Sequence, residues 1–252
     1  MSEPVIKVFD TPAQAAAACA GVVAEALAAA EAENRLCSLC LSGGSTPKAV
    51  FFLLAKEEGL PWSRAEFYWG DERYVGPEHK DSNFRAAHEL LIKPLGIGEA
   101  SVHPIPTAAG DPAADARRYE TALRARWPKA PAPAFDVLLL GLGPDGHTAS
   151  LFPGVAALDE EERWVAAVHR PAGHGPGAAA DDAPRWRVTL TPPALAGARA
   201  TVFLAVGEDK AEAVERVLRG SGPDEDCPAR LVQPQGAPAL WLLDAAAAKR
   251  LG

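Results

Sequence analysis

The sequence has little of what marks a disulfide scaffold, a membrane span or a nucleic-acid-binding surface. Its 252 residues include 4 cysteines, too few to cross-link a chain of this length. No apolar run approaches the roughly 20 residues that a bilayer span needs, and residues 1–10 lack the basic-then-apolar order of a secretory signal. The formal net charge of -8 argues against binding to nucleic-acid phosphates. We therefore expect a cytoplasmic protein with no nucleic-acid or membrane partner.

The cysteines are not arranged for a metal either. Cys37 and Cys40 form a Cys-x-x-Cys pair, but both fall in the apolar run 36–41, where residues three apart point to opposite faces of a strand. No second Cys or His pair at zinc spacing accompanies them. His169 and His174 border a loop rich in Gly, Ala, Pro and Asp, and we expect both at the surface. The sequence predicts core cysteines and no metal.

What the sequence does contain is a regular alternation of strand and helix patterns, with 48% hydrophobic residues to fill a core. The predicted strands are 5–9, 35–41, 66–69, 102–105, 137–140, 164–168, 185–190, 201–206 and 240–243. The predicted helices are 11–34, one from about 48, 81–92, 111–127, 210–219 and one at the C-terminus. This order predicts one domain over 1–252, a Rossmann-like α/β fold of three layers with a mostly parallel central sheet and helices on both faces. We expect a monomer.

The stretch Phe135–Pro153 is the strongest candidate for chemistry. Val137–Leu140 is an unbroken apolar run, as in a strand covered on both faces, and a glycine-rich turn follows at its carboxyl end. Open α/β sheets bind their ligands at that end of the strands. The turn carries Asp145 two residues before His147, so a carboxylate can orient an imidazole that acts as a general base.

The same turn contains Gly141-x-Gly143-x-x-Gly146, the spacing of a dinucleotide-binding motif. That motif needs a long helix from its third glycine and belongs to the first βαβ unit of a chain. Here Pro153 breaks the segment within two turns, and the motif lies past mid-chain. We therefore expect no nicotinamide and no other cofactor.

A second turn, Ser42–Pro47, leads into the predicted helix near Lys48. Gly44, Ser45 and Thr46 would place backbone N–H groups and hydroxyls at the positive end of that helix, which suits a phosphate group. The Gly-Lys-Ser/Thr ending of a Walker loop is missing.

Charged residues follow other predicted strands. Asp71 and Arg73 come directly after the predicted strand 66–69. Lys210 begins the helix that follows strand 201–206. A cation at the positive end of a helix dipole is unfavourable unless an anion lies between the two. Asn83 stands at the start of helix 81–92 and could serve only to cap it. In a chain this acidic, an anionic substrate would need such a local cluster of cations.

Six motifs in this order resemble the 6-phosphogluconolactonase family over almost the whole chain. They are Ser42-Gly-Gly-Ser-Thr-Pro, Gly70-Asp-Glu-Arg, Asp81-Ser-Asn, Gly143-Pro-Asp-Gly-His-Thr-Ala-Ser-Leu-Phe-Pro, Arg187-Val-Thr-Leu-Thr and Gly207-x-x-Lys210. The resemblance implies hydrolysis of 6-phospho-D-glucono-1,5-lactone to 6-phosphogluconate in the oxidative pentose phosphate pathway, without cofactor or metal.

The resemblance also implies roles for single residues. His147 would activate water, with Asp145 and Asp71 orienting or stabilising the imidazolium. The substrate and its phosphate would be bound by Gly44, Ser45, Thr46, Arg73, Asn83, Arg187 and Lys210. In the family, a segment rich in Pro-Pro usually leads up to this motif, whereas here Trp186 lies between two arginines. This difference leaves open whether Arg185 or Arg187 faces the phosphate. We favour Arg187.

Two alternatives remain. The related glucosamine-6-phosphate deaminases share the Asp-Gly-His turn, but their pattern has an acidic residue five positions after the histidine, where this chain has Phe152. A non-catalytic sugar-phosphate sensor is the other alternative, and the presence of both Asp145 and His147 argues against it.

Overall fold

The computed structural model describes residues 3–174, 185–220 and 222–252. Its centre is a parallel sheet of 7 strands in the order β1-β10-β9-β6-β2-β3-β5. These strands are β1 (Val5–Phe9), β2 (Cys37–Leu41), β3 (Ala65–Trp69), β5 (Val102–His103), β6 (Val137–Leu140), β9 (Ala200–Ala205) and β10 (Leu240–Asp244). Because all of them run the same way, their carboxyl ends meet along one edge of the sheet.

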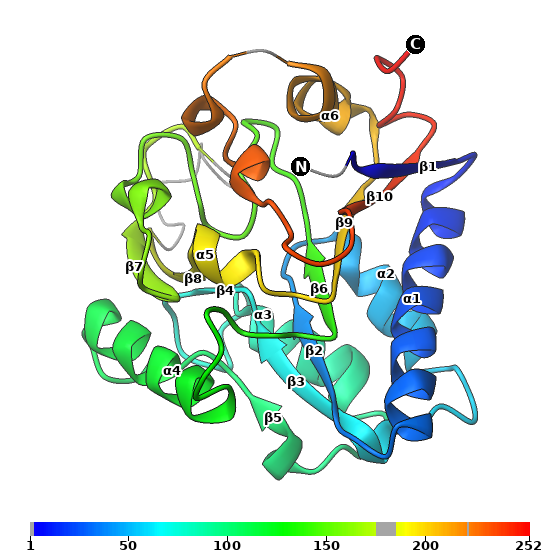
Figure 1. The fold of residues 1–252 in the computed structure, drawn as a ribbon, viewed down its shortest axis with the longest axis vertical. Coiled ribbons are helices and arrows are strands. Elements are labelled where there is room, and N and C mark those ends of the chain that lie inside the picture. Colours follow the sequence, from blue (N-terminus) through cyan, green and yellow to red (C-terminus); the bar gives the residue numbers. More distant parts are fainter. Residues whose placement is uncertain (1–2, 175–184, 221) are drawn as a thin grey trace.

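Helices cover the sheet on both sides, as the sequence predicts. They are α1 (Pro12–Ala32), α2 (Thr46–Leu54), α3 (Asn83–Ala87), α4 (Pro112–Arg126), α5 (Pro192–Leu195) and α6 (Ala211–Arg219). Figure 1 shows α1 and α2 together on one side of the sheet, with α4 and α5 on the other. The predicted layered α/β architecture is therefore confirmed.

A second sheet of 3 antiparallel strands, in the order β4-β8-β7, packs beside the first. It consists of β4 (Asp71–Arg73), β7 (Val165–His169) and β8 (Trp186–Leu190). β4 is missing from the predicted strands because three charged residues give no strand pattern. The N–H of Leu190 donates to the carbonyl of Gly70 at 2.8 Å, which links β8 to the end of β3. The charged segment 71–73 is thus held as a strand.

Helix starts follow the expected capping chemistry. Thr11 and Gln14 form a capping box at α1: the Gln14 N–H donates to the Thr11 hydroxyl at 3.3 Å, and the Thr11 N–H donates to the Gln14 side chain at 3.0 Å. Ser82 caps α3 by accepting the N–H of Arg85 at 3.1 Å. The suggestion that Asn83 serves only as a cap is wrong, because its side chain donates to Asp71.

The core is built as the strand patterns indicate. β2 and β6 are buried along their whole length, and Cys37 and Cys40 are free thiols buried within that core. Burial raises the pKa of the Cys37 thiol to about 12. Core packing of this pair is therefore confirmed.

One expectation about helices is wrong, and another is refined. Residues 245–250 form turns in place of a C-terminal helix. The N–H of Ala248 donates to the carbonyl four residues earlier, but the N–H of Lys249 donates to the carbonyl three residues earlier, so no regular α-helix continues. The predicted helix 81–92 is α3 followed by a π-helical turn over His88–Ile92.

The expectation that no stretch is long and apolar enough to span a bilayer is wrong for α1. By length and composition alone its 21 residues qualify. In this fold, however, one face of α1 is buried against the sheet and α2. Its buried residues are Ala15, Ala16, Cys19, Ala20, Val23, Leu27 and Ala30.

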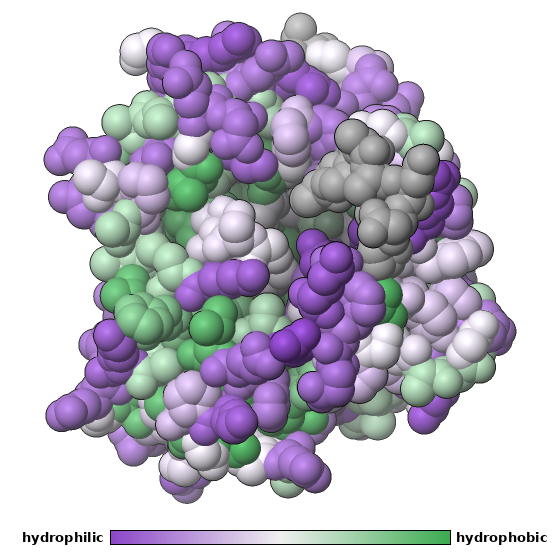
Figure 2. All heavy atoms as spheres, turned by 180° about the vertical axis from the view of Figure 1, so that it is seen from behind, coloured by the Kyte–Doolittle hydropathy of each residue, from purple (hydrophilic) through white to green (hydrophobic). Residues whose placement is uncertain are grey.

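The face of the molecule opposite to that in Figure 1 is shown in Figure 2, where hydrophilic residues make up much of the surface and hydrophobic residues lie between them.

Candidate active site

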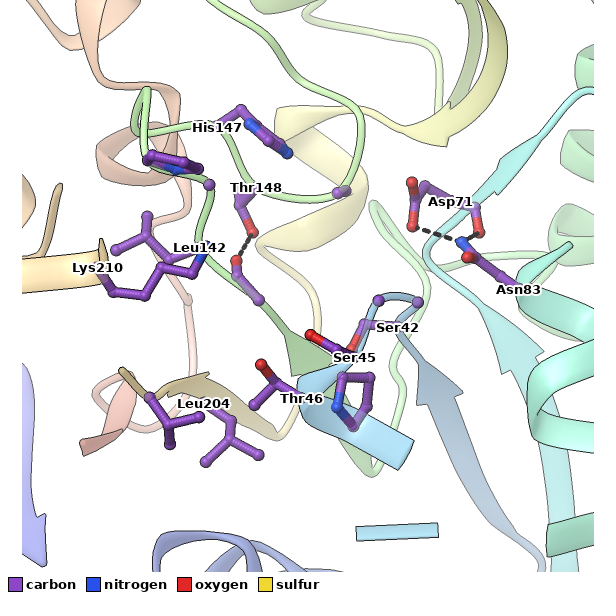
Figure 3. Close-up of a pocket in the computed structure, with 18 of the residues that line it drawn as sticks. Ser42, Ser45, Thr46, Asp71, Asn83, Leu142, His147, Thr148, Leu204 and Lys210 are labelled. Carbon is purple, nitrogen blue, oxygen red and sulfur yellow. Dashed lines mark hydrogen bonds between the residues drawn. The ribbon is translucent and has the colours of Figure 1, made fainter. Parts of the chain in front are cut away.

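A pocket of about 520 Å³ lies at the carboxyl ends of β2, β3, β6 and β9. Figure 3 shows side chains from these different segments pointing into it, with His147 and Lys210 across from Ser45 and Thr46, and Asp71 and Asn83 at another wall. The predicted site residues that line it are Gly44, Ser45, Thr46, Asp71, Arg73, Asn83, His147, Arg187 and Lys210. The parallel sheet thus gathers predicted residues from Gly44 to Lys210 around one cavity.

His147 is 8% exposed and is held by Asp145. Its ring Nδ1 makes a hydrogen bond with Asp145 Oδ1, and its backbone N–H donates to the same oxygen at 3.3 Å. An ionised carboxylate only accepts, so Nδ1 carries the proton and Nε2 keeps its lone pair. Burial works against the charge on Asp145, but hydrogen bonds from His147 and then His174 hold the pKa of this carboxyl well below its usual range. This pair can act as an oriented general base.

Glycine is required in the turn that delivers this pair. A Cβ on Gly143 would lie 2.0 Å from His147 Nδ1 and 2.6 Å from Asp145 Oδ1. Gly146 has φ +83, and a Cβ there would lie 2.6 Å from the sulfur of Cys227. Of the glycines at the dinucleotide-like spacing, Gly143 therefore makes room for the two catalytic candidates, and Gly146 makes room for Cys227.

Phe152 packs against the imidazole. Its ring centroid lies 4.5 Å from that of His147, and the residue is 2% exposed. It also lines the pocket. The position five residues after the histidine is therefore an apolar wall of the site.

The start of α2 forms the opposite wall. Ser45 is the N-cap residue and makes no side-chain capping bond, so the first-turn N–H groups are left to bind other acceptors. Gly43 lies two residues before Ser45, and a Cβ there would lie 1.8 Å from the Asn83 side-chain oxygen. The turn 42–47 thus ends in a helix N-terminus that lines the pocket, and its binding of a phosphate stays a prediction.

Asp71 is 7% exposed and belongs to a hydrogen-bond network in the pocket wall. Its Oδ2 accepts the Ser150 hydroxyl at 2.7 Å, and its Oδ1 accepts the Asn83 amide at 3.2 Å. The same amide donates to the Asp71 carbonyl at 2.9 Å. Asp71 therefore holds Ser150 and Asn83 in place, whereas the carboxylate that is hydrogen-bonded to His147 is that of Asp145.

Glu72 is a site residue that sequence reasoning missed. It is 2% exposed and accepts the backbone N–H groups of Arg73, Asn83 and Phe84, each at 2.7 Å. Burial raises the pKa of the Glu72 carboxyl to about 7, although these N–H groups act to lower it. The residue ties β4 to the start of α3 and so positions Arg73 and Asn83. In the sequence it is only one more acid beside Asp71, and nothing local signals that it is buried.

Among the described residues, three cations line the pocket: Arg73, Arg187 and Lys210. Arg73 and Arg187 are register partners across β4 and β8, and Arg187 is 5% exposed. Burial, and then the positive charge of Arg73, lower the pKa of Arg187 to about 10. Arg185 is exposed and is not among the pocket-lining residues, so Arg187 is the arginine that faces the cavity. Lys210 enters from the start of α6, with its Nζ 3.0 Å from Asp209 Oδ2.

The two loop histidines differ from each other. His169 is exposed, as expected. His174 is not a plain surface residue, because its Nδ1 lies 2.9 Å from Asp145 Oδ2. Over residues 3–174, 185–220 and 222–252, no group of three or more His, Cys, Asp or Glu side chains is arranged to hold a metal ion.

A family model described as glucosamine-6-phosphate isomerases/6-phosphogluconolactonase matches residues 10–241. The chain belongs to this family. A 6-phosphogluconolactonase of Synechocystis sp. is 41% identical over 222 residues, which are 87% of each chain. The 6-phosphogluconolactonase of Rattus norvegicus is 38% identical over 252 residues, covering 98% of this chain and 93% of the rat protein.

Solved structures of the family agree with this assignment. The 6-phosphogluconolactonase from Trypanosoma brucei superposes with a TM-score of 0.85 at 32% identity, covering 100% of both chains. A monomeric glucosamine-6-phosphate deaminase has a TM-score of 0.81 at 21% identity, which shows the shared fold alone. The family therefore includes both chemistries on one fold, and the site has to distinguish them.

Proposed function

We propose that this protein hydrolyses 6-phospho-D-glucono-1,5-lactone to 6-phosphogluconate in the oxidative pentose phosphate pathway. The names of the relatives from Synechocystis sp. and Rattus norvegicus, which match 87% and 98% of this chain, support this substrate. The observation that decides between the two chemistries of the family is Phe152, whose ring packs on His147 and carries no proton to exchange. A deaminase needs an acid-base group there to open the sugar ring and move protons, whereas a lactone is already an activated ester.

The phosphate is the handle by which the substrate is held. The N-terminus of α2 supplies N–H groups and the hydroxyls of Ser45 and Thr46, while Arg73, Arg187 and Lys210 supply positive charge. Asn83, fixed by Asp71, faces the same cavity. Binding energy at the phosphate thereby places the lactone carbonyl near His147, and orientation lowers part of the barrier.

The reaction itself needs one base that later acts as an acid. A water molecule gives a proton to His147 Nε2 while its oxygen bonds to the lactone carbonyl carbon, forming a tetrahedral oxyanion. Asp145 stabilises the resulting imidazolium through Nδ1. When the oxyanion re-forms the carbonyl, the bond to the ring oxygen breaks, and that oxygen takes the proton from Nε2. The new carboxylic acid then loses its proton to solvent.

The proposal is tested by assaying the purified protein on two substrates. We expect 6-phosphogluconolactone to be hydrolysed well above the enzyme-free rate, and glucosamine-6-phosphate to release no ammonia. Ammonia release would favour the deaminase. Tight binding of 6-phosphogluconate without any turnover would favour the sensor.

We also propose that residues 1–252 act as one sugar-phosphate lactonase domain, because the relative from Trypanosoma brucei matches the chain over its full length. A cytoplasmic location and a monomeric state stay predictions. Cell fractionation tests the first, and light scattering on a sizing column tests the second.

A further inference from the structure

Asp145 is shared between two imidazoles. Its Oδ1 is bound by His147 Nδ1, and its Oδ2 lies 2.9 Å from His174 Nδ1. The two histidines lie 27 residues apart in the chain, and each binds a different oxygen of the Asp145 carboxylate. The Asp145 side chain is 18% exposed. Because a carboxylate only accepts, both Nδ1 atoms donate to it.

The position of His174 is itself determined by its surroundings. Its carbonyl accepts a hydrogen bond from Nη1 of Arg170 at 3.2 Å, and its backbone N–H donates one to the carbonyl of Pro171 at 3.4 Å. Arg170 is 4% exposed, so it is a buried anchor for this turn. The His174 side chain is 31% exposed. These contacts direct the ring at Asp145.

We propose that His174 is a positioning residue of the lactonase, which acts on His147 through Asp145. By holding Oδ2 it fixes the plane of the carboxylate, so that Oδ1 stays in line with His147 Nδ1 and Nε2 faces the substrate. By donating a hydrogen bond it also takes up part of the negative charge that would otherwise stabilise the His147 imidazolium. The proposal deepens the lactonase function and rests on it.

Other charges near this pair have to be considered. On the outer side of Asp145, a cavity of about 620 Å³ is lined by His174, Arg216, Asp226, Cys227 and Arg230. Arg216 donates to the Asp145 carbonyl at 3.4 Å and not to its carboxylate. The charged groups on the substrate side of His147 are Asp71, Arg73, Arg187, Asp209 and Lys210. All of these stay in place when only His174 is changed, so a change in titration behaviour reports on His174.

The test compares His174→Ala and His174→Asn with the wild-type enzyme. His169→Ala is the matched control, because His169 lies five residues before His174 and meets the ring of Trp186 edge-on, at 5.0 Å between ring centroids. For His174→Ala we expect kcat to fall roughly 10-fold, as for a modest misplacement of a catalytic group, with KM nearly unchanged. His174→Asn should recover most of this loss, because the asparagine amide can donate to Oδ2 from about the place of Nδ1.

The pH profile separates positioning from a merely structural role. Removing one hydrogen bond leaves more charge on Asp145 to stabilise the protonated His147, so the rising limb of kcat/KM should move to higher pH by up to about one unit. Ring-nitrogen NMR should show the titration midpoint of His147 moving the same way, without any turnover. Unchanged midpoints in His174→Ala, by both kinetics and NMR, would overturn the proposal.

The two measurements also separate this inference from the proposed function. If the wild-type protein fails to hydrolyse the lactone, the proposed function fails, while the NMR titration still reports whether His174 acts on His147. If the lactone is hydrolysed and both midpoints stay fixed, only the role of His174 fails.

Discussion

Arg73 and Arg187 stand directly opposite each other across the antiparallel strands β4 and β8, so two cations are paired at the wall of the pocket. Like charges in opposed positions destabilise a sheet. The lowered pKa of Arg187, to about 10, reflects burial first and the charge of Arg73 second. We propose that the substrate phosphate held at the start of α2 also contacts both side chains, where its negative charge offsets their repulsion.

Arg187→Met should weaken binding of 6-phosphogluconate by about 10- to 150-fold, the equivalent of a charge-assisted contact of roughly 1.5–3 kcal/mol. The affinity that remains should depend less on salt. Calorimetry at several salt concentrations measures both effects. Arg185→Met is the matched control, since Arg185 lies two residues away and is exposed. Equal affinities of the two variants would remove Arg187 from the phosphate site.

His147→Ala should lower kcat by about 10²–10⁴-fold, the usual contribution of a positioned acid-base group, while 6-phosphogluconate still binds. Binding should persist because the phosphate contacts come from other segments. The lactone opens spontaneously, so an enzyme-free rate has to be subtracted. Near-normal turnover by the folded variant would contradict the assignment of the base.

Gly143→Ala should reduce activity nearly as far as His147→Ala, since the new Cβ would lie 2.0 Å from His147 Nδ1. The imidazole must then leave its place beside Asp145. Gly141→Ala is the control, because a Cβ there meets nothing within 4 Å. Circular dichroism and product binding establish that both variants fold. If Gly143→Ala kept full activity, the ring orientation described here would not be the reactive one.

Asp145 should make stability depend on acid pH. The pKa of its carboxyl is lower in the folded protein than the unfolded value of 3.8, so its contribution to the free energy of unfolding is present above about pH 4. That contribution is lost as the pH falls through the folded pKa, because both states are then protonated. Urea unfolding of wild type and Asp145→Asn should show a gap in stability at pH 6 that closes toward pH 2. A gap that is constant with pH would mean that Asp145 is not held as a stabilised anion.

Lactonase activity should persist in EDTA. A neutral imidazole is sufficient to activate water against a lactone carbonyl, so the proposed steps need no Lewis acid. The measurement is the initial rate in EDTA, with and without added zinc or magnesium. Activity lost in EDTA and restored by one of these metals would show that another group activates the nucleophile.

Much of the site could be predicted because its parts are local in the chain. The apolar run Val137–Leu140 predicts a buried strand, and in a parallel sheet the residues after such a strand lie at the ligand-binding edge. The turn with Asp145 and His147 and the start of α2 after Ser42 follow this rule. Their chemistry can be read from residue types at fixed spacing.

The sequence by itself determined the α/β architecture, the active-site turn and the set of cations, because strand patterns, capping residues and turn glycines act over a few neighbouring positions. Only the tertiary structure decided that Glu72 is buried, that Arg73 opposes Arg187 and that His174 shares Asp145 with His147. Each of these depends on the register and packing of segments far apart in the chain. Charged residues give no periodic signal, so their partners become known only when the strands and loops that carry them have come together.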